Sequence, residues 1–280
     1  MEGQAKPERD GAAQPRVGFI GVGNQGGPIA RRIGEAGWPL TVWTRRAEAF
    51  APFADIASFG GTPEALAAVS DILCLCVVDD AGVCELFERV LPALRQGALI
   101  AVMSTIHPDT CVRLAQRAAA RGVALIDAPV SGGAAGAEAG TLTVMMGGAE
   151  TDCARAEAVF RCFGRLIVRL GDVGAGQRAK LVNNTLLAAI LDVTQDARET
   201  GVALGLDPAA LDSVLAASSG DSFGLRVLRA LPALSAFGNG ARLLRKDVGL
   251  LNDLCGVAGV PSPPMIGAGT RFLDRATGTV

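Results

Sequence analysis

The 280-residue sequence contains a single histidine, His107, and seven scattered cysteines. Zinc sites are built from several His, Cys or carboxylate ligands held close together. A single histidine and scattered cysteines argue against such a site, and we expect no metal. The cysteines are odd in number and several sit inside apolar runs, which is typical of buried thiols in a reducing compartment. The sequence therefore predicts a cytoplasmic protein.

Long apolar runs and a strong charge of either sign are also lacking. No stretch of about 18 apolar residues appears, so we expect no transmembrane helix. The formal net charge is only −2, which offers no attraction to nucleic acid or to an anionic membrane. We therefore expect neither as a partner, and a small neutral or acidic ligand instead.

The first half of the chain has the pattern of an α/β domain. Residues 1–14 are polar and alanine-rich without the features of a secretory signal, and we expect a flexible tail there. Short β-rich runs then alternate with helical patterns, which predicts a doubly wound parallel sheet, a Rossmann domain, over residues 15–173. The expected strands are Val17–Ile20, Leu40–Trp43, Ile72–Val78, Ala98–Met103, Val123–Ile126, Leu142–Met146 and Leu166–Leu170.

The second half has the pattern of helices alone. Gln177–Leu206 carries apolar residues at helical spacing without an internal proline, which predicts one long interdomain helix. Asp207 and Pro208 form a typical N-cap and first-turn pair, and further helical patterns follow. We therefore expect an all-α domain over residues 174–280.

A glycine motif follows the first expected strand. Gly21, Gly23 and Gly26 form G-x-G-x-x-G, with Asn24 and Gln25 inside it. The first glycine permits a tight turn, the second lets a pyrophosphate approach the backbone, and the third allows close packing, while the helix N-terminus offers free N–H groups. The strand before it and the helix after it indicate a dinucleotide site.

The second expected strand ends in Thr44, Arg45 and Arg46. NAD-binding sheets place a carboxylate here for the ribose hydroxyls, whereas a guanidinium can bind a 2′-phosphate through two charge-assisted hydrogen bonds. The sequence therefore predicts NADP (NADPH), with NAD as the other cofactor that fits. The alternative is that both arginines belong to an ordinary solvated surface.

A second glycine-rich loop, with Ser131, Gly132 and Gly133, follows a buried strand. Ligands of open α/β sheets bind at the carboxyl ends of the strands, and glycines let backbone N–H groups converge on a carboxylate. We expect this loop to bind a small carboxylate-bearing substrate, with an ordinary glycine turn as the alternative.

Lys180 and Asn184 share one face of the long helix, four residues apart. Burial and the positive helix end should lower the pKa of the lysine from about 10.4, so that it can exchange protons near neutral pH. Lys180 is thus the expected general acid and base, and Asn184 the residue that orients it or the substrate. The alternative is a surface lysine lying along the helix.

Two other polar positions have simpler interpretations. Lys246 and Asp247 precede an apolar helical run, and Lys246 either reaches the nicotinamide or forms an exposed ion pair with Asp247. His107 lies in the polar turn before Pro108, which explains it without catalysis.

Three segments in fixed order, Gly21–Gly37, Asp127–Gly148 and Gly174–Asn184, resemble the motifs of the β-hydroxyacid dehydrogenase family. The family includes 3-hydroxyisobutyrate dehydrogenase, tartronate semialdehyde reductase and glyoxylate/succinic semialdehyde reductase, and the match runs from Val17 to about Phe272. The resemblance implies that Lys180 is catalytic and that Ser131, Gly132, Gly133 and Asn184 contact substrate. It also implies homo-oligomers, such as a homodimer, built through the helical domain.

The resemblance also implies that Thr105 and Lys246 reach the cofactor, and Arg45 matches an arginine of NADP-preferring members. The expected cofactor-binding residues are Gly21, Gly23, Asn24, Gln25, Gly26, Thr44, Arg45, Val78, Thr105 and Lys246. The expected function is an NADP-dependent oxidoreductase that transfers a hydride between nicotinamide and a small β-hydroxy acid or the matching aldehyde acid.

The sequence departs from the family at three places. Val102-Met103 precedes Ser104-Thr105 where many relatives have aspartate, Asp79-Asp80 stands where several have proline, and the chain ends at Val280 without the acidic closing segment. These differences leave the substrate undefined within the class. Imine reductases, which commonly carry aspartate or tyrosine in place of Lys180, and a non-catalytic dinucleotide-binding scaffold are the alternative functions.

Overall fold

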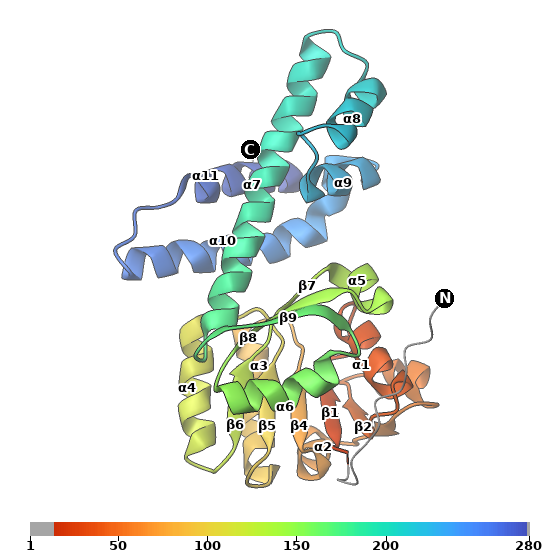
Figure 1. Cartoon of the computed structure of the whole chain (residues 1–280), viewed down its shortest axis with the longest axis vertical. Coiled ribbons are helices and arrows are strands. Elements are labelled where there is room, and N and C mark those ends of the chain that lie inside the picture. Colours follow the sequence, from red (N-terminus) through yellow and green to blue (C-terminus); the bar gives the residue numbers. More distant parts are fainter. Residues whose placement is uncertain (1–13, 279–280) are drawn as a thin grey trace. The chain divides into compact units, whose positions relative to one another are not determined.

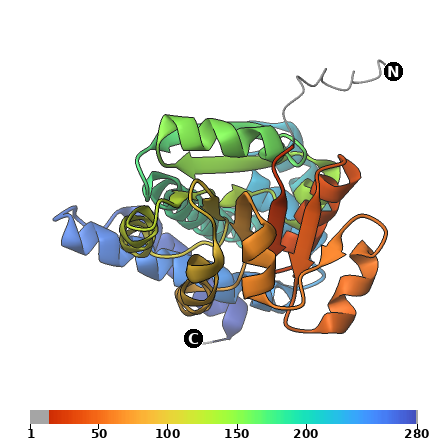
Figure 2. The same cartoon turned by 90° about the horizontal axis from the view of Figure 1, so that it is seen from below.

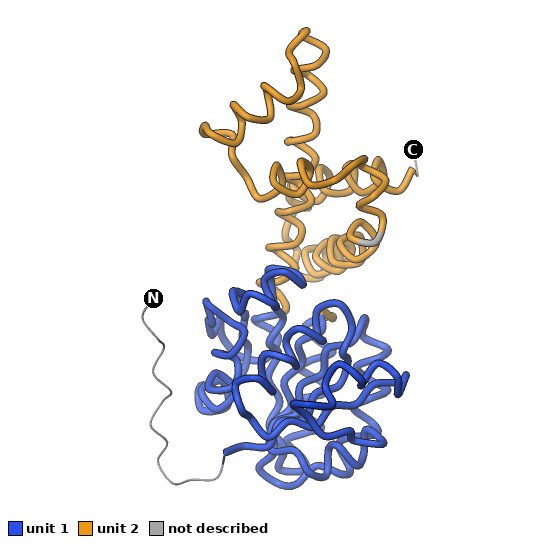
Figure 3. The backbone as a smooth tube through the Cα atoms, turned by 90° about the vertical axis from the view of Figure 1, so that its right-hand side faces the viewer, with its two compact units in different colours: residues 1–104, 108–176 blue, residues 105–107, 177–280 orange. Residues whose placement is uncertain are grey.

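The structure, a computed structural model, describes residues 14–278 and divides the chain into two compact units (Figure 3). Unit 1 holds the chain up to Ser104 together with Pro108–Gly176, and unit 2 holds Thr105–His107 together with the chain from Gln177 onward. The sequence set the boundary between residues 173 and 174, whereas Gly174–Gly176 group with unit 1 and Thr105–His107 with unit 2. Residues 1–13 of the expected tail lie outside the described residues.

Within the described residues, unit 1 is built on one nine-stranded sheet (Figure 1). The strands are β1 (Val17–Ile20), β2 (Leu40–Trp43), β3 (Ser58–Phe59), β4 (Ile72–Leu75), β5 (Leu99–Val102), β6 (Ala124–Asp127), β7 (Val130–Ser131), β8 (Leu142–Gly147) and β9 (Gly164–Gly171). Their order is β3-β2-β1-β4-β5-β6-β8-β7, with β9 on β8, and the first six pair in parallel. This is the order of a dinucleotide-binding sheet, and it reverses direction between β1 and β4. The predicted fold class is confirmed.

Helices of unit 1 cover both faces of the sheet (Figures 1 and 2). They are α1 (Gly26–Glu35), α2 (Pro63–Val69), α3 (Asp80–Val90), α4 (Pro108–Ala119), α5 (Gly133–Ala139) and α6 (Glu150–Phe160), with 3-10 turns at Ala47–Phe53 and Leu91–Ala93. Side chains fix several starts: Thr62 accepts the N–H of Ala65, and Asp79 accepts that of Gly82. Such caps satisfy N–H groups that a first helical turn leaves free.

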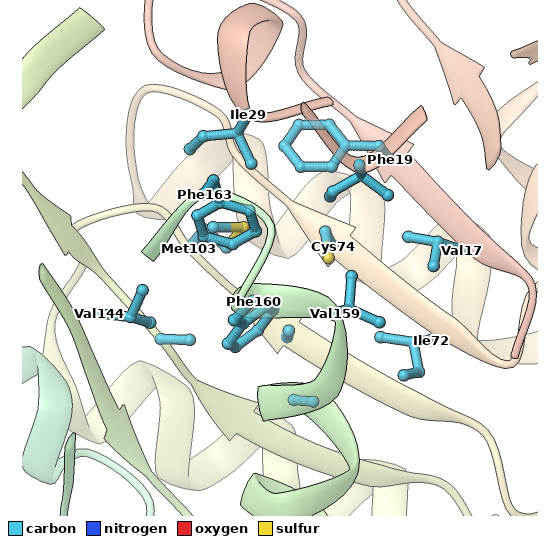
Figure 4. Packing of buried hydrophobic residues seen from close by; sticks show 14 of the residues in the cluster. Val17, Phe19, Ile29, Ile72, Cys74, Met103, Val144, Val159, Phe160 and Phe163 are labelled. Carbon is cyan, nitrogen blue, oxygen red and sulfur yellow. The ribbon is translucent and has the colours of Figure 1, made fainter. Parts of the chain in front are cut away.

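The core of unit 1 explains why the strands are short and apolar. All residues of β1, β4 and β5 are buried, as expected for parallel strands with helices on both faces. In Figure 4, Val17, Phe19, Ile72 and Cys74 of the strands share one cluster with Phe160 of α6 and its neighbours. Burial raises the pKa of the Cys74 thiol to about 12, so this cysteine packs as an inert apolar group.

The sheet is mostly parallel, and it departs from the parallel arrangement at one end. β8 is antiparallel to β6 and to β7. The connection from β7 to β8 runs from Gly132 to Thr141, which is shorter than the dozen or more residues of a parallel crossover. β3 and β7, which the sequence did not predict, have two residues each and are too short to show a periodic pattern.

Unit 2 consists of helices around a separate core. The elements are α7 (Ala175–Ala203), whose first two residues belong to unit 1, α8 (Pro208–Ala217), α9 (Phe223–Ala230), a 3-10 turn (Leu234–Phe237), α10 (Gly238–Val257) and α11 (Pro264–Thr277). Leu181, Leu191, Leu228, Val248 and Phe272 are among its buried side chains. The predicted N-cap is confirmed, since the Asp207 side chain accepts the N–H of Ala210 at 2.8 Å. Across residues 14–278, no helix is long and apolar enough to cross a membrane.

Candidate active site

The glycine loop lies at the carboxyl edge of the sheet where its order reverses. Gly21 has φ +103°, and a Cβ there would overlap the carbonyl oxygen of Cys76. A Cβ on Gly26 would overlap the carbonyl oxygen of Gly21, whereas one on Gly23 would meet nothing within 4 Å. The loop is therefore tightly folded at its first and third glycines and open at the second, which fits the close approach of a pyrophosphate.

The start of α1 also suits an anion. Gln25 occupies the N-cap position without a side-chain hydrogen bond to the helix, and the first turn holds no acidic residue. The Gly27 N–H already donates to the Gly23 carbonyl at 2.8 Å and Pro28 has no N–H, so the positive helix end is the main feature that attracts a phosphate here. Asn24 beside it is exposed.

The ends of β2 and β4 meet the same edge, because Trp43 and Leu75 both pair with Ile20. Arg45 follows Thr44 after β2 and is exposed, and no hydrogen bond or ion pair of its side chain is found in the described part of the chain. Val78 follows β4 and is 68% exposed. The structure thus brings the glycine loop, Thr44, Arg45 and Val78 to one edge of unit 1.

The loop with Ser131 begins at the carboxyl end of β6, beside β5 in the same sheet. Gly132 and Gly133 both have positive φ, +129° and +64°, and both are exposed. Glycine is required there, because other residues rarely adopt that backbone conformation. Asp127 at the end of β6 is fully buried and accepts the N–H of Gly174 at 2.6 Å, which ties this strand to the chain leading into α7.

Lys180 is a buried lysine of unit 2, close enough to Asp247 and Lys246 for both charges to affect its pKa. Lys180 is only 9% exposed, and burial lowers the pKa of its ammonium group to about 8. Asp247 raises that pKa and Lys246 lowers it, but desolvation outweighs both. The predicted fall in pKa is thus present, and burial is its principal cause.

Asn184 and Asp247 form one polar cluster with Lys180 and Lys246. The Asn184 Nδ2 donates to Asp247 Oδ2 at 2.6 Å, and both side chains are buried. Lys246 Nζ lies 3.1 Å from Asp247 Oδ1 and donates a hydrogen bond to the backbone carbonyl of Thr105. The alternative of an exposed ion pair is therefore wrong for Asp247, which is 4% exposed.

Gln177 joins the same cluster from the start of α7. Its side chain is fully buried, and its Oε1 accepts the N–H of Ile106 at 3.1 Å. Thr105 and Ile106 are thus held by α10 and α7, which explains why Thr105–His107 group with unit 2. Each unit therefore carries its own group of predicted site residues: Thr105, Lys180, Asn184 and Lys246 in unit 2, and the remainder in unit 1.

A cavity of about 620 Å³ lies elsewhere in unit 1, beside Ile72 and Ala98 at the amino ends of β4 and β5. Its charged groups are already paired, since Asp71 accepts from Arg95 and Arg155 donates to the carbonyl of Gly97. Ligands of open α/β sheets bind at the opposite, carboxyl edge. In the described part of the chain, no group of three or more His, Cys, Asp and Glu side chains is placed to hold a metal ion.

Comparisons with known proteins agree with this geometry. Residues 16–176 match the model of the NAD-binding domain of 6-phosphogluconate dehydrogenase, and residues 174–276 match that of the NAD-binding domain of NADP-dependent 3-hydroxyisobutyrate dehydrogenase. The chain is 36% identical to 3-hydroxyisobutyrate dehydrogenase of Pseudomonas aeruginosa over 92% of its length and 90% of the relative's. It is 33% identical to the mitochondrial enzyme of Bos taurus, over 95% and 83%.

The chain belongs to the β-hydroxyacid dehydrogenase family. Among solved structures, Mycobacterium tuberculosis 3-hydroxyisobutyrate dehydrogenase with L-serine superposes with a TM-score of 0.83 at 27% identity, over 94% of both chains. This member of the β-hydroxyacid dehydrogenase family is thus a 3-hydroxyisobutyrate dehydrogenase-like oxidoreductase with a nicotinamide dinucleotide as cofactor.

Asp247 and Gln177 were missed as site residues, although a signal for the cluster was present in this β-hydroxyacid dehydrogenase sequence. Only three of its 26 basic residues are lysines, Lys6, Lys180 and Lys246. Arginine stays charged almost everywhere, whereas a buried lysine can lose its proton. Two of these three lysines, Lys180 and Lys246, are the ones that lie in the cluster with Asp247.

Proposed function

We propose that this protein is an NADP-preferring oxidoreductase acting between small 3-hydroxy acids and the matching aldehyde acids, with Lys180 as the general acid and base. The observation that carries the proposal is a nine-tenths buried lysine with a pKa near 8, next to the Asn184–Asp247 pair. Bound NADPH supplies the hydride in the direction of reduction.

Lys180 would move the proton that balances this transfer. In reduction its ammonium donates a proton to the carbonyl oxygen of the aldehyde acid while the carbonyl carbon receives the hydride, which gives the hydroxy acid. In oxidation the neutral amine accepts the hydroxyl proton. A pKa of about 8 leaves both forms populated near neutral pH, as an acid–base catalyst requires.

Substrate recognition would come from one loop and one amide. The Ser131 hydroxyl and the backbone N–H groups of Gly132 and Gly133 are suited to a carboxylate, because the two glycines carry no side chain of their own and the space beside Gly133 is open to 4 Å. Asn184 would hold the hydroxyl or carbonyl end. The L-serine in the mycobacterial relative carries a carboxylate and a 3-hydroxyl, which supports this class.

The cofactor contacts follow from the carboxyl edge of unit 1. Gly21, Gly23 and Gly26 would take the pyrophosphate, and Thr44 with Arg45 the 2′-phosphate. Val78, Asn24 and Gln25 line the same edge, while Thr105 and Lys246 would contact the nicotinamide side. Thr44, Arg45 and Arg46, rather than a carboxylate, come directly after β2, which supports NADP.

We also propose that the protein forms a homo-oligomer through unit 2. Val182, Leu186 and Val193 form an exposed apolar stripe on one face of α7, and exposed apolar patches of this kind mark contact surfaces. Substituting Val193 with aspartate should then reduce the molar mass measured by light scattering. An unchanged mass would place any oligomer contact elsewhere.

The central test is a kinetic comparison of Lys180→Ala with the native enzyme in an NADPH-oxidation screen across short aldehyde acids. We expect turnover of at least one of these acids, its loss in the variant, and unchanged binding of NADPH. Near-normal turnover of Lys180→Ala would refute the acid–base role, and inactivity of the native enzyme on all of these acids would refute the substrate class.

A further inference from the structure

Asp247 is a buried carboxylate that the proton transfer does not use. Its two oxygens have different partners: Oδ2 accepts from Asn184 Nδ2 at 2.6 Å, and Oδ1 lies 3.1 Å from Lys246 Nζ. Oδ1 accepts no hydrogen bond within the described residues, so this second contact is an ion pair alone. The carboxylate therefore stands between an amide on α7 and an ammonium on α10.

The contacts continue beyond Asp247 in both directions. Lys246 donates to the carbonyl of Thr105, in the segment that we assign to the cofactor. Asn184 lies one helical turn from Lys180 on the same face of α7. A continuous series of polar contacts thus joins Thr105 to Asn184 through Lys246 and Asp247.

We propose that Asp247 is a positioning residue that fixes Asn184 and Lys246 relative to each other, so that the substrate-side amide and the cofactor-side segment of unit 2 stay aligned. The inference rests on the proposed function and deepens it, because it assigns how the substrate-binding amide is held. Asp247 itself need not touch the substrate.

The hydrogen bond between Asn184 and Asp247 explains why a carboxylate is suited to position 247. An ionised carboxylate only accepts hydrogen bonds, so it selects the NH₂ side of the Asn184 amide and turns the amide oxygen away. That oxygen accepts from Asn183 Nδ2 at 3.2 Å. The orientation of the Asn184 amide is therefore set before a substrate arrives, which lowers the cost of ordering it on binding.

The charge of Asp247 has a second consequence in the same cluster. The charged groups that act on Lys180 are Asp247 and Lys246, both from α10. Removing the negative charge leaves two neighbouring ammonium groups without a counter-ion. Lys180 should then release its proton at lower pH, an effect that a merely space-filling residue would not produce.

The first test measures binding without turnover. The enzyme is loaded with NADPH, and the dissociation constant of 3-hydroxyisobutyrate in this non-reacting complex is measured for Asp247→Ala, Asn184→Ala and the double variant. We expect each single change to weaken binding by about tenfold, in the range of one lost charge-assisted hydrogen bond, and the double variant to be no weaker than either. A double variant weakened by the product of the two effects would overturn the proposal.

Two further variants sharpen this comparison. Asp247→Asn keeps an acceptor oxygen and the side-chain shape, so it should restore most of the binding lost in Asp247→Ala; failure to do so in a folded variant would overturn the positioning role. Asp253→Asn makes the same charge change at an exposed position of α10 and should bind as the native enzyme does.

The second test follows the amine of Lys180 in the enzyme without cofactor. The chain's amines are the N-terminus, Lys6, Lys180 and Lys246, so mass spectrometry can follow the reductive methylation of each lysine against pH. Asp247→Asn should lower the pKa obtained for Lys180, while Asp253→Asn should not. An unchanged pKa in Asp247→Asn would overturn the electrostatic part. Neither test needs turnover, so an active Lys180→Ala enzyme would refute the proposed function without altering these outcomes.

Discussion

The side chain of Gln177 accepts a 3.1 Å hydrogen bond from the backbone N–H of Ile106, and both residues are fully buried. They lie 71 positions apart in the sequence. With the bond from Lys246 to the Thr105 carbonyl, it holds Thr105–His107 on the helices of unit 2. A segment that follows a strand of the sheet is therefore fixed by residues far along the chain.

Gln177→Leu should destabilise the protein, because it leaves the buried N–H of Ile106 without an acceptor. The free energy of unfolding should fall by about 1–3 kcal/mol, as measured by denaturant titration. Gln195→Leu is the matched control on α7, since its side chain donates to Glu199 in an exposed hydrogen bond. A loss no larger than that of the control would mean that the Gln177 bond contributes little.

The pH dependence of the two reaction directions should be opposite. Reduction requires the ammonium of Lys180, so its kcat should fall as pH rises through about 8, the pKa of this residue. Oxidation requires the neutral amine, and its kcat should rise through the same pH. Initial rates in both directions from pH 6 to 10 test this, and profiles with the same sign in both directions would contradict the role of Lys180.

The same lysine should make the protein more stable at alkaline pH. Its pKa is lowered from 10.5 to about 8 on folding, so the unfolded chain binds more protons between these values and stability rises with pH across that window. Below pH 8 the full penalty applies, about 3 kcal/mol for a shift of this size. Lys180→Met should therefore be more stable than the native protein at pH 7, and the difference should shrink above pH 10.

Strands and helix ends that are determined by neighbouring residues could be predicted from the sequence. Val17–Ile20 and Leu40–Trp43 form strands over the predicted residues, and Asp207 caps its helix. Their apolar runs and capping residues determine structure within a few positions. Glycine spacing likewise located the loop at Gly21, whose left-handed φ excludes most other residues.

Contacts between distant residues were not predictable in the same way. Asp247 lies 63 positions from Asn184, and nothing in the sequence near Asp247 distinguishes a buried acceptor from half of a surface ion pair. The strand at Leu142–Met146 was predicted but its antiparallel direction was not, because strand direction depends on how a connection packs rather than on the strand's own residues.

The choice between NADP and NAD should depend on Arg45. Arg45→Ala should weaken NADPH binding by about 10- to 100-fold, as expected for the loss of charge-assisted hydrogen bonds to a 2′-phosphate, and should leave NADH binding nearly unchanged. Arg121→Ala, at another exposed position of unit 1, controls for the loss of one positive charge. Equal losses of affinity for NADPH and NADH would mean that Arg45 does not bind the 2′-phosphate.

Alanine substitutions at Gly23 and Gly26 should have different effects on stability. A methyl group on Gly26 would overlap the carbonyl of Gly21, so Gly26→Ala should both destabilise the protein and weaken both dinucleotides. A methyl group on Gly23 would meet nothing within 4 Å, so Gly23→Ala should leave the thermal midpoint unchanged while it obstructs the approach of the pyrophosphate and weakens NADPH and NADH alike. Thermal unfolding and dinucleotide titration separate the two cases. Normal dinucleotide binding by Gly23→Ala would mean that the pyrophosphate does not approach the backbone at this glycine.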